Sequence, residues 1–425
     1  MNFINQLLSK VKQRLQNRFI RNMGWFGGSE VVIRVSRLVT TVILARFLNS
    51  YDYGLAAIVL TVTEFTHALT RVGVNVPIVQ AEAEDLDEVC QSAYWFNWLL
   101  CGSLFIVQCI LSFPIAWFYK DARLILPICV MGTPFLILPI SAVQQALIQR
   151  ENRLKITAIT NSVQVSCANL TSALLAALGM GMWALVLPFL TTTPIWVYMH
   201  YTNHDWRATK KISTKYWKEI WDCSKNIWSI ELLNSARNYL DYMIVGRFLG
   251  VAELGLYFFA FNAGLGISLS IVKGVNSALL PHLCEARSNW TLFKENYFSS
   301  IKTIAIIIIP FVALQASLAP IYVPIIFGQK WVPAVPVLIL ICLSAIPRPF
   351  AEAALQLLIA FGRADLGLRW NVFFTTIFIG SLLVGVHWQV FGVAMSVLLI
   401  HVLAIPIFVV LATRFVFKNM LASGA

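Results

Sequence analysis

One stretch of this sequence occurs twice, and the second copy keeps a constant distance from the first. Residues Ile43–Leu55 align with Ile244–Leu256 at an offset of 201 residues. The identical pairs include Arg46 with Arg247, Phe47 with Phe248, Leu48 with Leu249, Gly54 with Gly255 and Leu55 with Leu256. At the same offset, Glu30 falls on Glu231 and Gly73-Val74-Asn75 falls on Gly274-Val275-Asn276. Because a self-match in fixed register indicates an internal repeat, we expect two halves of one architecture.

The composition places this repeat in a lipid bilayer. Of the 425 residues, 58% are hydrophobic and 12% are charged, and the mean hydropathy is +0.73, whereas soluble domains contain about 25% charged residues. A helix that spans a bilayer needs about 20 mostly apolar residues, and twelve such runs are present. They cover residues 24–48, 53–79, 89–117, 124–148, 156–178, 182–201, 226–249, 254–280, 300–326, 334–360, 366–386 and 389–415. The predicted fold class is an all-α polytopic membrane protein with about twelve transmembrane helices in two six-helix repeats.

Lys and Arg between the apolar runs predict the orientation, because such residues accumulate in cytoplasmic loops. They are concentrated before the first run, in residues 201–225 and in alternate connections elsewhere, so both termini are expected in the cytoplasm. Six spans in each half make the two repeats parallel, as in transporters whose halves rock about a central site. Residues 82–88 are the exception, since they carry five acids and no base on the expected cytoplasmic side. Acidic residues have little influence on orientation, and the topology is retained.

The chain is expected to divide into two lobes with flanking segments. Residues 1–22 carry apolar residues at helical spacing among basic ones, which is typical of an amphipathic helix on the membrane surface. Residues 23–201 are predicted to form the N-lobe, 202–225 a basic cytoplasmic inter-lobe linker and 226–417 the C-lobe. Residues 418–425 are predicted to be a C-terminal tail, whose last five residues could be a remnant of an expression vector on a truncated chain.

Charged side chains inside the predicted spans indicate a polar chamber. Each costs at least about 2.5–3.5 kcal/mol to insert, so those present usually face a cavity or a partner. Glu30, Arg34 and Arg37 share one face of the first span, as expected from their helical spacing. The bases predicted to line the chamber and bind substrate are Arg34, Arg37, Arg71, Arg237, Lys273 and Arg348, and the other ionisable residues are Glu30, Glu64, His67, Glu231, Asp241 and Glu352.

The chemistry of these side chains leaves three roles open. Guanidinium groups donate bidentate hydrogen bonds that suit a phosphate or pyrophosphate. The acids and His67 could instead titrate with a coupling ion. Neighbours four residues apart, such as Glu30 with Arg34 or Arg348 with Glu352, could also form intrahelical ion pairs that neutralise each other.

The sequence also excludes several kinds of site and partner. Its eight cysteines are scattered without a C-x-x-C pair, so no metal site, disulfide framework or cofactor is expected. The net charge of +12 is not gathered on one soluble domain, which argues against a nucleic-acid partner. The outer connections are too short for a folded catalytic loop, so the chain is not predicted to be an enzyme.

The second copy of the repeat resembles a known family. Arg237–Tyr257 is similar to the seventh-span signature of bacterial oligosaccharide flippases, and Ile43–Leu55 and the Pro281 ending of span eight also look like that group. These flippases form the polysaccharide-transporter (Wzx-like) branch of the multidrug, oligosaccharidyl-lipid and polysaccharide (MOP) exporter superfamily. The resemblance covers essentially the whole chain, and it implies two six-helix lobes in a V that work by alternating access.

The resemblance also implies a substrate and a place. Such a flippase moves an undecaprenyl-pyrophosphate-linked oligosaccharide across the bacterial inner (cytoplasmic) membrane for O-antigen, capsule or exopolysaccharide synthesis. Its partners would be this lipid-linked sugar, the membrane lipids and a polymerase of the same pathway. The family has a cationic central cavity, which the six bases above could supply. Some relatives have two further C-terminal helices.

Three other interpretations stay open. A cation-coupled multidrug exporter of the same superfamily would bind its ion and drug at Glu30, Glu64 or Asp241, although the excess of bases suits cationic drugs poorly. A membrane enzyme of the polysaccharide pathway would need the outer loop that this chain lacks. A membrane scaffold would leave the charges inside the spans unexplained.

Overall fold

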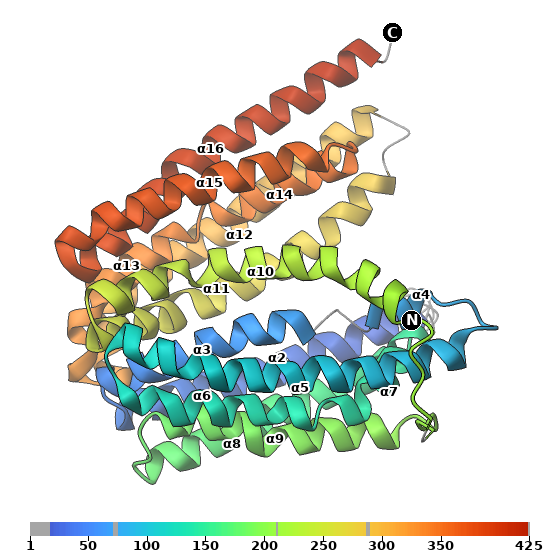
Figure 1. The fold of residues 1–425 in the computed structure, drawn as a ribbon. Coiled ribbons are helices and arrows are strands. Elements are labelled where there is room, and N and C mark those ends of the chain that lie inside the picture. Colours follow the sequence, from blue (N-terminus) through green and yellow to red (C-terminus); the bar gives the residue numbers. More distant parts are fainter. Residues whose placement is uncertain (1–17, 71–74, 210, 286–289, 424–425) are drawn as a thin grey trace, which may run out of the picture. The chain divides into compact units, whose positions relative to one another are not determined.

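The computed structural model describes residues 18–70, 75–209, 211–285 and 290–423 (Figure 1). All regular elements in these ranges are helices, and they contain no β-strand, which confirms the predicted all-α class. The α-helices are α2 (Arg18–Phe47), α3 (Ser50–Thr70), α4 (Asn75–Gln80), α5 (Leu86–Tyr119), α6 (Ile125–Gly132), α7 (Pro139–Arg150), α8 (Leu154–Ala177), α9 (Trp183–Thr202), α10 (Trp217–Phe248), α11 (Val251–Glu285), α12 (Trp290–Tyr322), α13 (Val335–Ser344), α14 (Arg348–Ala360), α15 (Ala364–Gly385) and α16 (Gln389–Ser423). Short 3₁₀ or π turns are η1 (Ala122–Leu124), η2 (Thr133–Leu136), η3 (Val323–Phe327), η4 (Gln329–Ala334) and η5 (Val386–Trp388).

Each predicted span coincides with one helix or with a broken pair of helices. Within the described ranges, five helical stretches are long and apolar enough to cross a membrane, among them Leu86–Tyr119 and Trp290–Phe327. A sixth is the pair Ala122–Leu136 and Pro139–Arg150, which meet at a bend of 57°. Proline lacks an N–H donor and clashes with the preceding turn, so Pro139 accounts for this break. The chain is a multi-pass membrane protein, and the number of twelve spans stays a prediction.

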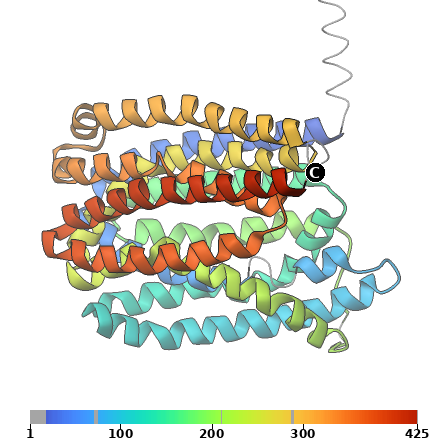
Figure 2. The same cartoon turned by 90° about the horizontal axis from the view of Figure 1, so that it is seen from above.

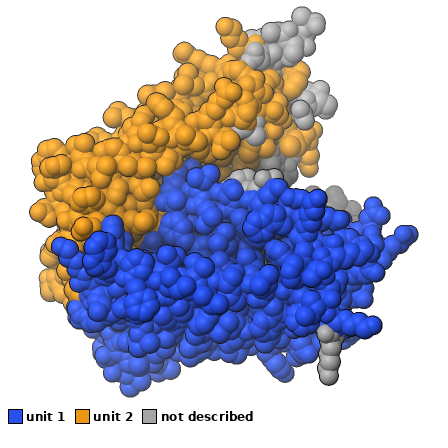
Figure 3. All heavy atoms as spheres, in the orientation of Figure 1, with its two compact units in different colours: residues 1–49, 58–238 blue, residues 50–57, 239–425 orange. Residues whose placement is uncertain are grey.

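The helices pack into two compact units, which Figure 3 shows in different colours. The first comprises residues 1–49 and 58–238, and the second comprises residues 50–57 and 239–425. The chain therefore passes from the first unit to the second inside α10, between Asn238 and Tyr239, and the first two turns of α3 belong to the second unit. The lobe boundaries expected from the repeat stay a prediction.

Hydrogen bonds hold α2 against α8 in the first unit, where both helices run side by side (Figures 1 and 2). The Ser29 hydroxyl donates to the Ala158 carbonyl over 2.9 Å, and the Thr40 hydroxyl donates to the Asn169 carbonyl over 3.0 Å. The Asn169 amide donates to the Ser36 hydroxyl over 2.8 Å. Because Ser29, Ser36 and Thr40 recur at helical spacing, they form one face of α2, and that face is covered by α8.

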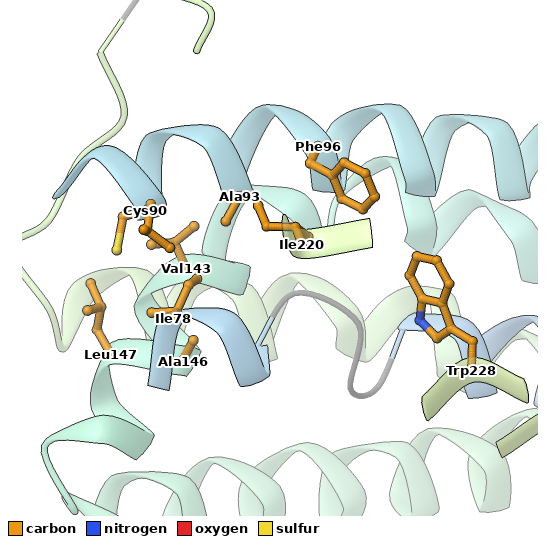
Figure 4. Close-up of a cluster of buried hydrophobic side chains, with 10 residues drawn as sticks. Ile78, Cys90, Ala93, Phe96, Val143, Ala146, Leu147, Ile220 and Trp228 are labelled. Carbon is orange, nitrogen blue, oxygen red and sulfur yellow. The ribbon is translucent and has the colours of Figure 1, made fainter. Parts of the chain in front are cut away.

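The start of α10 is packed into the core of the first unit. Figure 4 shows Ile220 and Trp228 of α10 facing Phe96 of α5, together with buried residues of α4 and α7. The Phe96 and Trp228 rings stack at 6.4 Å with an interplanar angle of 9°. This apolar contact fixes the beginning of α10 to the first unit.

Aromatic side chains form the core of the second unit around Trp331 of η4. The Phe259 ring stacks on Trp331 at 4.0 Å, and the Tyr53 ring meets Trp331 edge-on at 5.1 Å. Tyr53 is 3% exposed although it comes from α3, the second helix of the first sequence repeat. It therefore anchors the first two turns of α3 within the second unit.

Predictions for the chain ends fall partly outside the described residues. Residues 1–17 of the expected amphipathic segment are not among them, and α2 begins at Arg18 and continues through residue 22 without a break. At the other end, α16 extends to Ser423.

Candidate functional site

The charged face of α2 combines one ion pair with one exposed guanidinium. The Arg34 guanidinium lies 3.0 Å from Glu30 Oε1, which is the intrahelical pairing considered as an alternative to substrate binding. Arg37 follows one turn later, is exposed, and has no side-chain partner among the described residues. Pairing reduces the net charge at Arg34, so Arg37 is the stronger anion-binding group on α2.

The orientation of α2 explains why this face stays accessible. Helical residues are spaced by about 100°, which puts Glu30, Arg34 and Arg37 roughly a quarter turn away from the Ser29, Ser36 and Thr40 face that packs on α8. The charged residues thus lie beside the α8 contact and outside it.

His67 and Glu64 lie on α3 and are both half-buried. The His67 ring packs against Phe135 of η2 at 4.8 Å and against Phe189 of α9 at 5.0 Å. Its Nδ1 is 3.5 Å from the Thr70 hydroxyl. Glu64 interacts with a neighbouring group as well. His67 is therefore held in an aromatic setting, which suits a packing role at least as well as a titrating one.

Asp241 of α10 is the centre of a polar cluster inside the second unit. It is 5% exposed, and its Oδ2 accepts a 2.7 Å hydrogen bond from the Tyr257 hydroxyl of α11. Its Oδ1 accepts a 2.9 Å bond from the backbone N–H of Tyr242. Arg348, the first residue of α14, is close enough to interact electrostatically with the carboxylate. Asp241 and Arg348 are therefore within electrostatic range of each other in the second unit.

Tyr257 was not among the predicted site residues, although the sequence contained a signal for it. The repeat aligns Asp241 with Thr40 and Tyr257 with Ala56. Both partners of this hydrogen bond therefore differ from the residues at the equivalent positions of the first half. Two such differences together are typical of a contact that is made in one half only.

Other predicted site residues lie on α10, α11 and α14. Glu231 and Arg237 are half-buried on α10, and Arg237 interacts with a neighbouring group. Glu352 of α14 accepts a 3.2 Å hydrogen bond from the Gln356 amide. Lys273 belongs to α11 by its backbone, whereas its side chain and the whole of Arg71 lie outside the described residues. A single chamber that collects all these groups stays a prediction.

No group of three or more His, Cys, Asp or Glu residues within the described ranges is arranged to hold a metal ion.

Sequence comparison gives a family match over most of the chain. The family described as "Polysaccharide biosynthesis protein" matches residues 43–336. An uncharacterized membrane protein in the cps region of Klebsiella pneumoniae is 27% identical over 386 residues, covering 88% of this chain and 78% of that protein. The lipopolysaccharide biosynthesis protein WzxC of Escherichia coli is 23% identical over 401 residues, covering 92% of this chain and 80% of its own length.

Two solved transporter structures have the same fold as this chain. An inward-facing multidrug resistance MATE family transporter of the MOP superfamily superposes with a TM-score of 0.73 at 14% identity, covering 90% of this chain and 94% of that one. The lipid II flippase MurJ in an inward closed conformation superposes with a TM-score of 0.72 at 13% identity, covering 92% and 87%. These similarities confirm the MOP-type fold that the family resemblance implied, and the TM-scores to the two kinds of transporter hardly differ.

Proposed function

The chain belongs to the polysaccharide biosynthesis protein family and has the fold of MOP-superfamily transporters, and from this premise we propose that it flips undecaprenyl-pyrophosphate-linked oligosaccharide units across the bacterial inner membrane. The products would be surface polysaccharides such as O-antigen, capsule or exopolysaccharide. Transport would proceed by alternating access, driven by an ion gradient or by the membrane potential. A polymerase of the same pathway would use the flipped unit.

The observation that supports this proposal most strongly is the exposed guanidinium of Arg37. It lies in a predicted span, where an uncompensated charge is costly, and it has no side-chain partner in the described part of the chain. A pyrophosphate would supply the missing counter-charge, because guanidinium groups bind phosphate oxygens through paired hydrogen bonds. Neutralisation would in turn lower the barrier for moving the charged head group through the bilayer.

Arg348 and Asp241 are proposed to have a different role. Arg348 interacts electrostatically with the buried Asp241 carboxylate, which already accepts a hydrogen bond from the Tyr257 hydroxyl. Part of its charge is therefore compensated within the protein, so it is a weaker pyrophosphate ligand than Arg37. Asp241 is proposed to take part in charge compensation within the second unit rather than in substrate binding.

The drug exporter of the same superfamily is the main rival. The fold alone does not separate the two, because the TM-scores to the MATE transporter and to MurJ are 0.73 and 0.72. The polysaccharide biosynthesis family match over residues 43–336 favours the flippase. The family and the structural neighbours are transporters, which is consistent with a protein that is not an enzyme.

A deletion strain tests this proposal in cells. We expect loss of surface polysaccharide, accumulation of lipid-linked oligosaccharide on the cytoplasmic side, and rescue by the parent gene. Arg37→Ala should fail to rescue, whereas Arg363→Ala, which removes an exposed arginine paired with Asp365 at 2.8 Å, should rescue. Normal polysaccharide with increased sensitivity to cationic drugs would support the exporter instead.

A further inference from the structure

The acidic segment, residues 82–88, contacts the predicted inter-lobe linker. On charge alone this segment contradicted the expected orientation. In the structure it leads into the start of α5, which receives hydrogen bonds from residues 204–209 and 211–217, here called the docked linker. Both belong to the first unit.

Side chains of the acidic segment and of the first turns of α5 accept hydrogen bonds from the docked linker. The Trp206 indole donates to Asp87 Oδ1 over 2.9 Å. The Thr209 backbone N–H and hydroxyl both donate to Gln91 Oε1, at 3.1 and 3.2 Å. The Lys215 ammonium donates to Glu88 Oε2. The polar side chains at the start of α5 thus accept hydrogen bonds from the docked linker, and the Lys215 ammonium offsets the charge of Glu88.

Ser92 continues this contact in the protein interior. It is fully buried, and its hydroxyl lies 2.8 Å from that of Ser213. Its carbonyl accepts a 3.0 Å hydrogen bond from the Trp217 indole. In the opposite direction, the Trp95 indole donates to the Lys211 carbonyl over 3.0 Å. The docked linker is therefore held through its backbone as well as through its charges.

Helix α7 and the residue that follows it contact the N-terminal end of the docked linker. The Gln144 amide donates to the Trp206 carbonyl over 3.1 Å, and His204 Nε2 lies 3.2 Å from Glu151, the residue that follows α7. Trp206, Tyr216 and Trp217 pack against the hydrophobic core that Ile220 joins. Hydrogen bonds and apolar burial thus fix the same segment.

We infer that the docked linker is a rigid part of the first unit throughout the transport cycle, held there by the acidic segment and the start of α5. This inference rests on the proposed function for its reference to transport. A flexible tether would leave its polar groups to water, whereas the Thr209 backbone N–H, the Ser213 hydroxyl and the Trp217 indole of this segment are bonded to the buried Gln91 and Ser92. The chain changes unit only later, between Asn238 and Tyr239, so conformational change is taken up beyond Trp217.

A disulfide between positions 92 and 213 tests this inference. The two hydroxyls are 2.8 Å apart, so the side chains point toward each other, and Ser92→Cys with Ser213→Cys places two thiols where oxidation can join them. Each single variant is the matched control for cross-linking to the native Cys90, and mass spectrometry of the linked peptide identifies the bond. We expect nearly complete oxidation in membranes and unchanged polysaccharide export before and after reduction.

Two outcomes would overturn the inference. Poor cross-linking of the double variant, with both thiols present, would show that the linker is not docked. Efficient cross-linking with export lost and then restored by reductant would show that the linker must detach. The parent protein without added cysteines tests the flippase proposal separately, and cross-linking yield reports docking even if the parent moves no polysaccharide.

A charge exchange provides a second measurement. Glu88→Lys and Lys215→Glu each place like charges together, and the double exchange restores the pair. Because exposed pairs contribute little, we expect each single variant to raise protease cleavage of the linker by only about twofold, and the double variant to restore the parent rate. Large single effects without restoration would contradict the assignment of this pair.

Discussion

Gly54 and Gly255, which the repeat aligns with each other, occupy reciprocal positions in one helix crossing of the second unit. A Cβ atom at Gly54 would lie 1.8 Å from the Val251 carbonyl oxygen, and one at Gly255 would lie 1.6 Å from the Ser50 carbonyl oxygen. Since the offset of 201 also aligns Ser50 with Val251, each helix start contacts the equivalent place on the other. The repeated motif is therefore self-complementary, and glycine is required because the two backbones touch.

Alanine at either of these glycines should destabilise the protein. The added methyl would overlap a backbone oxygen, which side-chain rotation cannot relieve, and overpacking typically costs about 1–3 kcal/mol. We expect Gly54→Ala and Gly255→Ala to lower the melting temperature in detergent. Gly380→Ala is the control, because a Cβ there meets nothing within 4 Å, and it should stay within about 1 kcal/mol of the parent. Equal stability of all three variants would show that the close crossing does not form.

Removal of the Tyr257 hydroxyl should destabilise the second unit. Asp241 is buried and would lose the 2.7 Å hydrogen bond to one carboxylate oxygen. An unsatisfied buried polar group costs about 1–3 kcal/mol, and more if it is charged. Tyr257→Phe should therefore unfold at lower temperature or denaturant concentration, and Tyr257→Phe with Asp241→Asn should recover part of the loss because the charge is removed. If the single variant keeps parental stability, the hydrogen bond contributes nothing.

The ion pair on α2 and the exposed arginine next to it should differ in their contribution to transport. Glu30→Gln removes one partner of an accessible pair four residues apart, and such pairs contribute about 0.2–0.5 kcal/mol. We expect it to change the flipping rate by no more than about twofold, whereas Arg37→Ala should reduce the rate by at least about tenfold, since hydrogen bonds to charged groups contribute about 1.5–3 kcal/mol. Initial rates at several substrate concentrations compare the two, and an equal loss would remove the distinction drawn between Arg34 and Arg37.

Docking of the linker should be insensitive to pH until strongly alkaline conditions. The hydrogen bond to Glu88 raises the pKa of Lys215 above its ordinary 10.5, and the hydrogen bond to Asp85 raises the pKa of Tyr216 above its ordinary 10.0. A group whose pKa is higher in the folded protein than in the unfolded protein stabilises the fold fully at pH values below its unfolded-state pKa. That contribution is lost as the pH rises through its folded-state pKa. Linker cleavage by a protease active at alkaline pH should thus be constant between pH 6 and 9 and increase above pH 10.5. An increase near pH 7 would contradict the assignment of this contact to Lys215 and Tyr216.

The sequence predicted the features that depend on local pattern. Helix positions followed from apolar runs because burial in lipid requires long apolar segments, and the i,i+4 spacing of Glu30 and Arg34 was enough to suggest their ion pair. The aligned Gly54 and Gly255 indicated a repeat. Their close approach depends on how α3 and α11 cross, and the spacing of residues in the sequence does not determine that crossing.

Features that depend on tertiary packing were missed for the same reason. In the sequence, the acidic segment was an exception to the preference for basic residues on the cytoplasmic side. In the structure, its side chains accept hydrogen bonds from Trp206 and Lys215, which lie more than a hundred residues away in the chain. Asp241 was selected for its charge, whereas the departure of Tyr257 from the repeat did not by itself identify Tyr257 as the hydrogen-bond partner. Burial and partner identity come from packing, which local pattern only constrains.

Flipping in proteoliposomes that contain a labelled undecaprenyl-pyrophosphate oligosaccharide would measure the proposed transport itself. Parent protein, Arg37→Ala and Arg363→Ala would be reconstituted in the same orientation, and transfer between leaflets would be followed under imposed ion gradients and membrane potential. We predict movement by the parent and by Arg363→Ala and strongly reduced movement by Arg37→Ala. Failure of the parent under every gradient, or full activity of Arg37→Ala, would contradict the account.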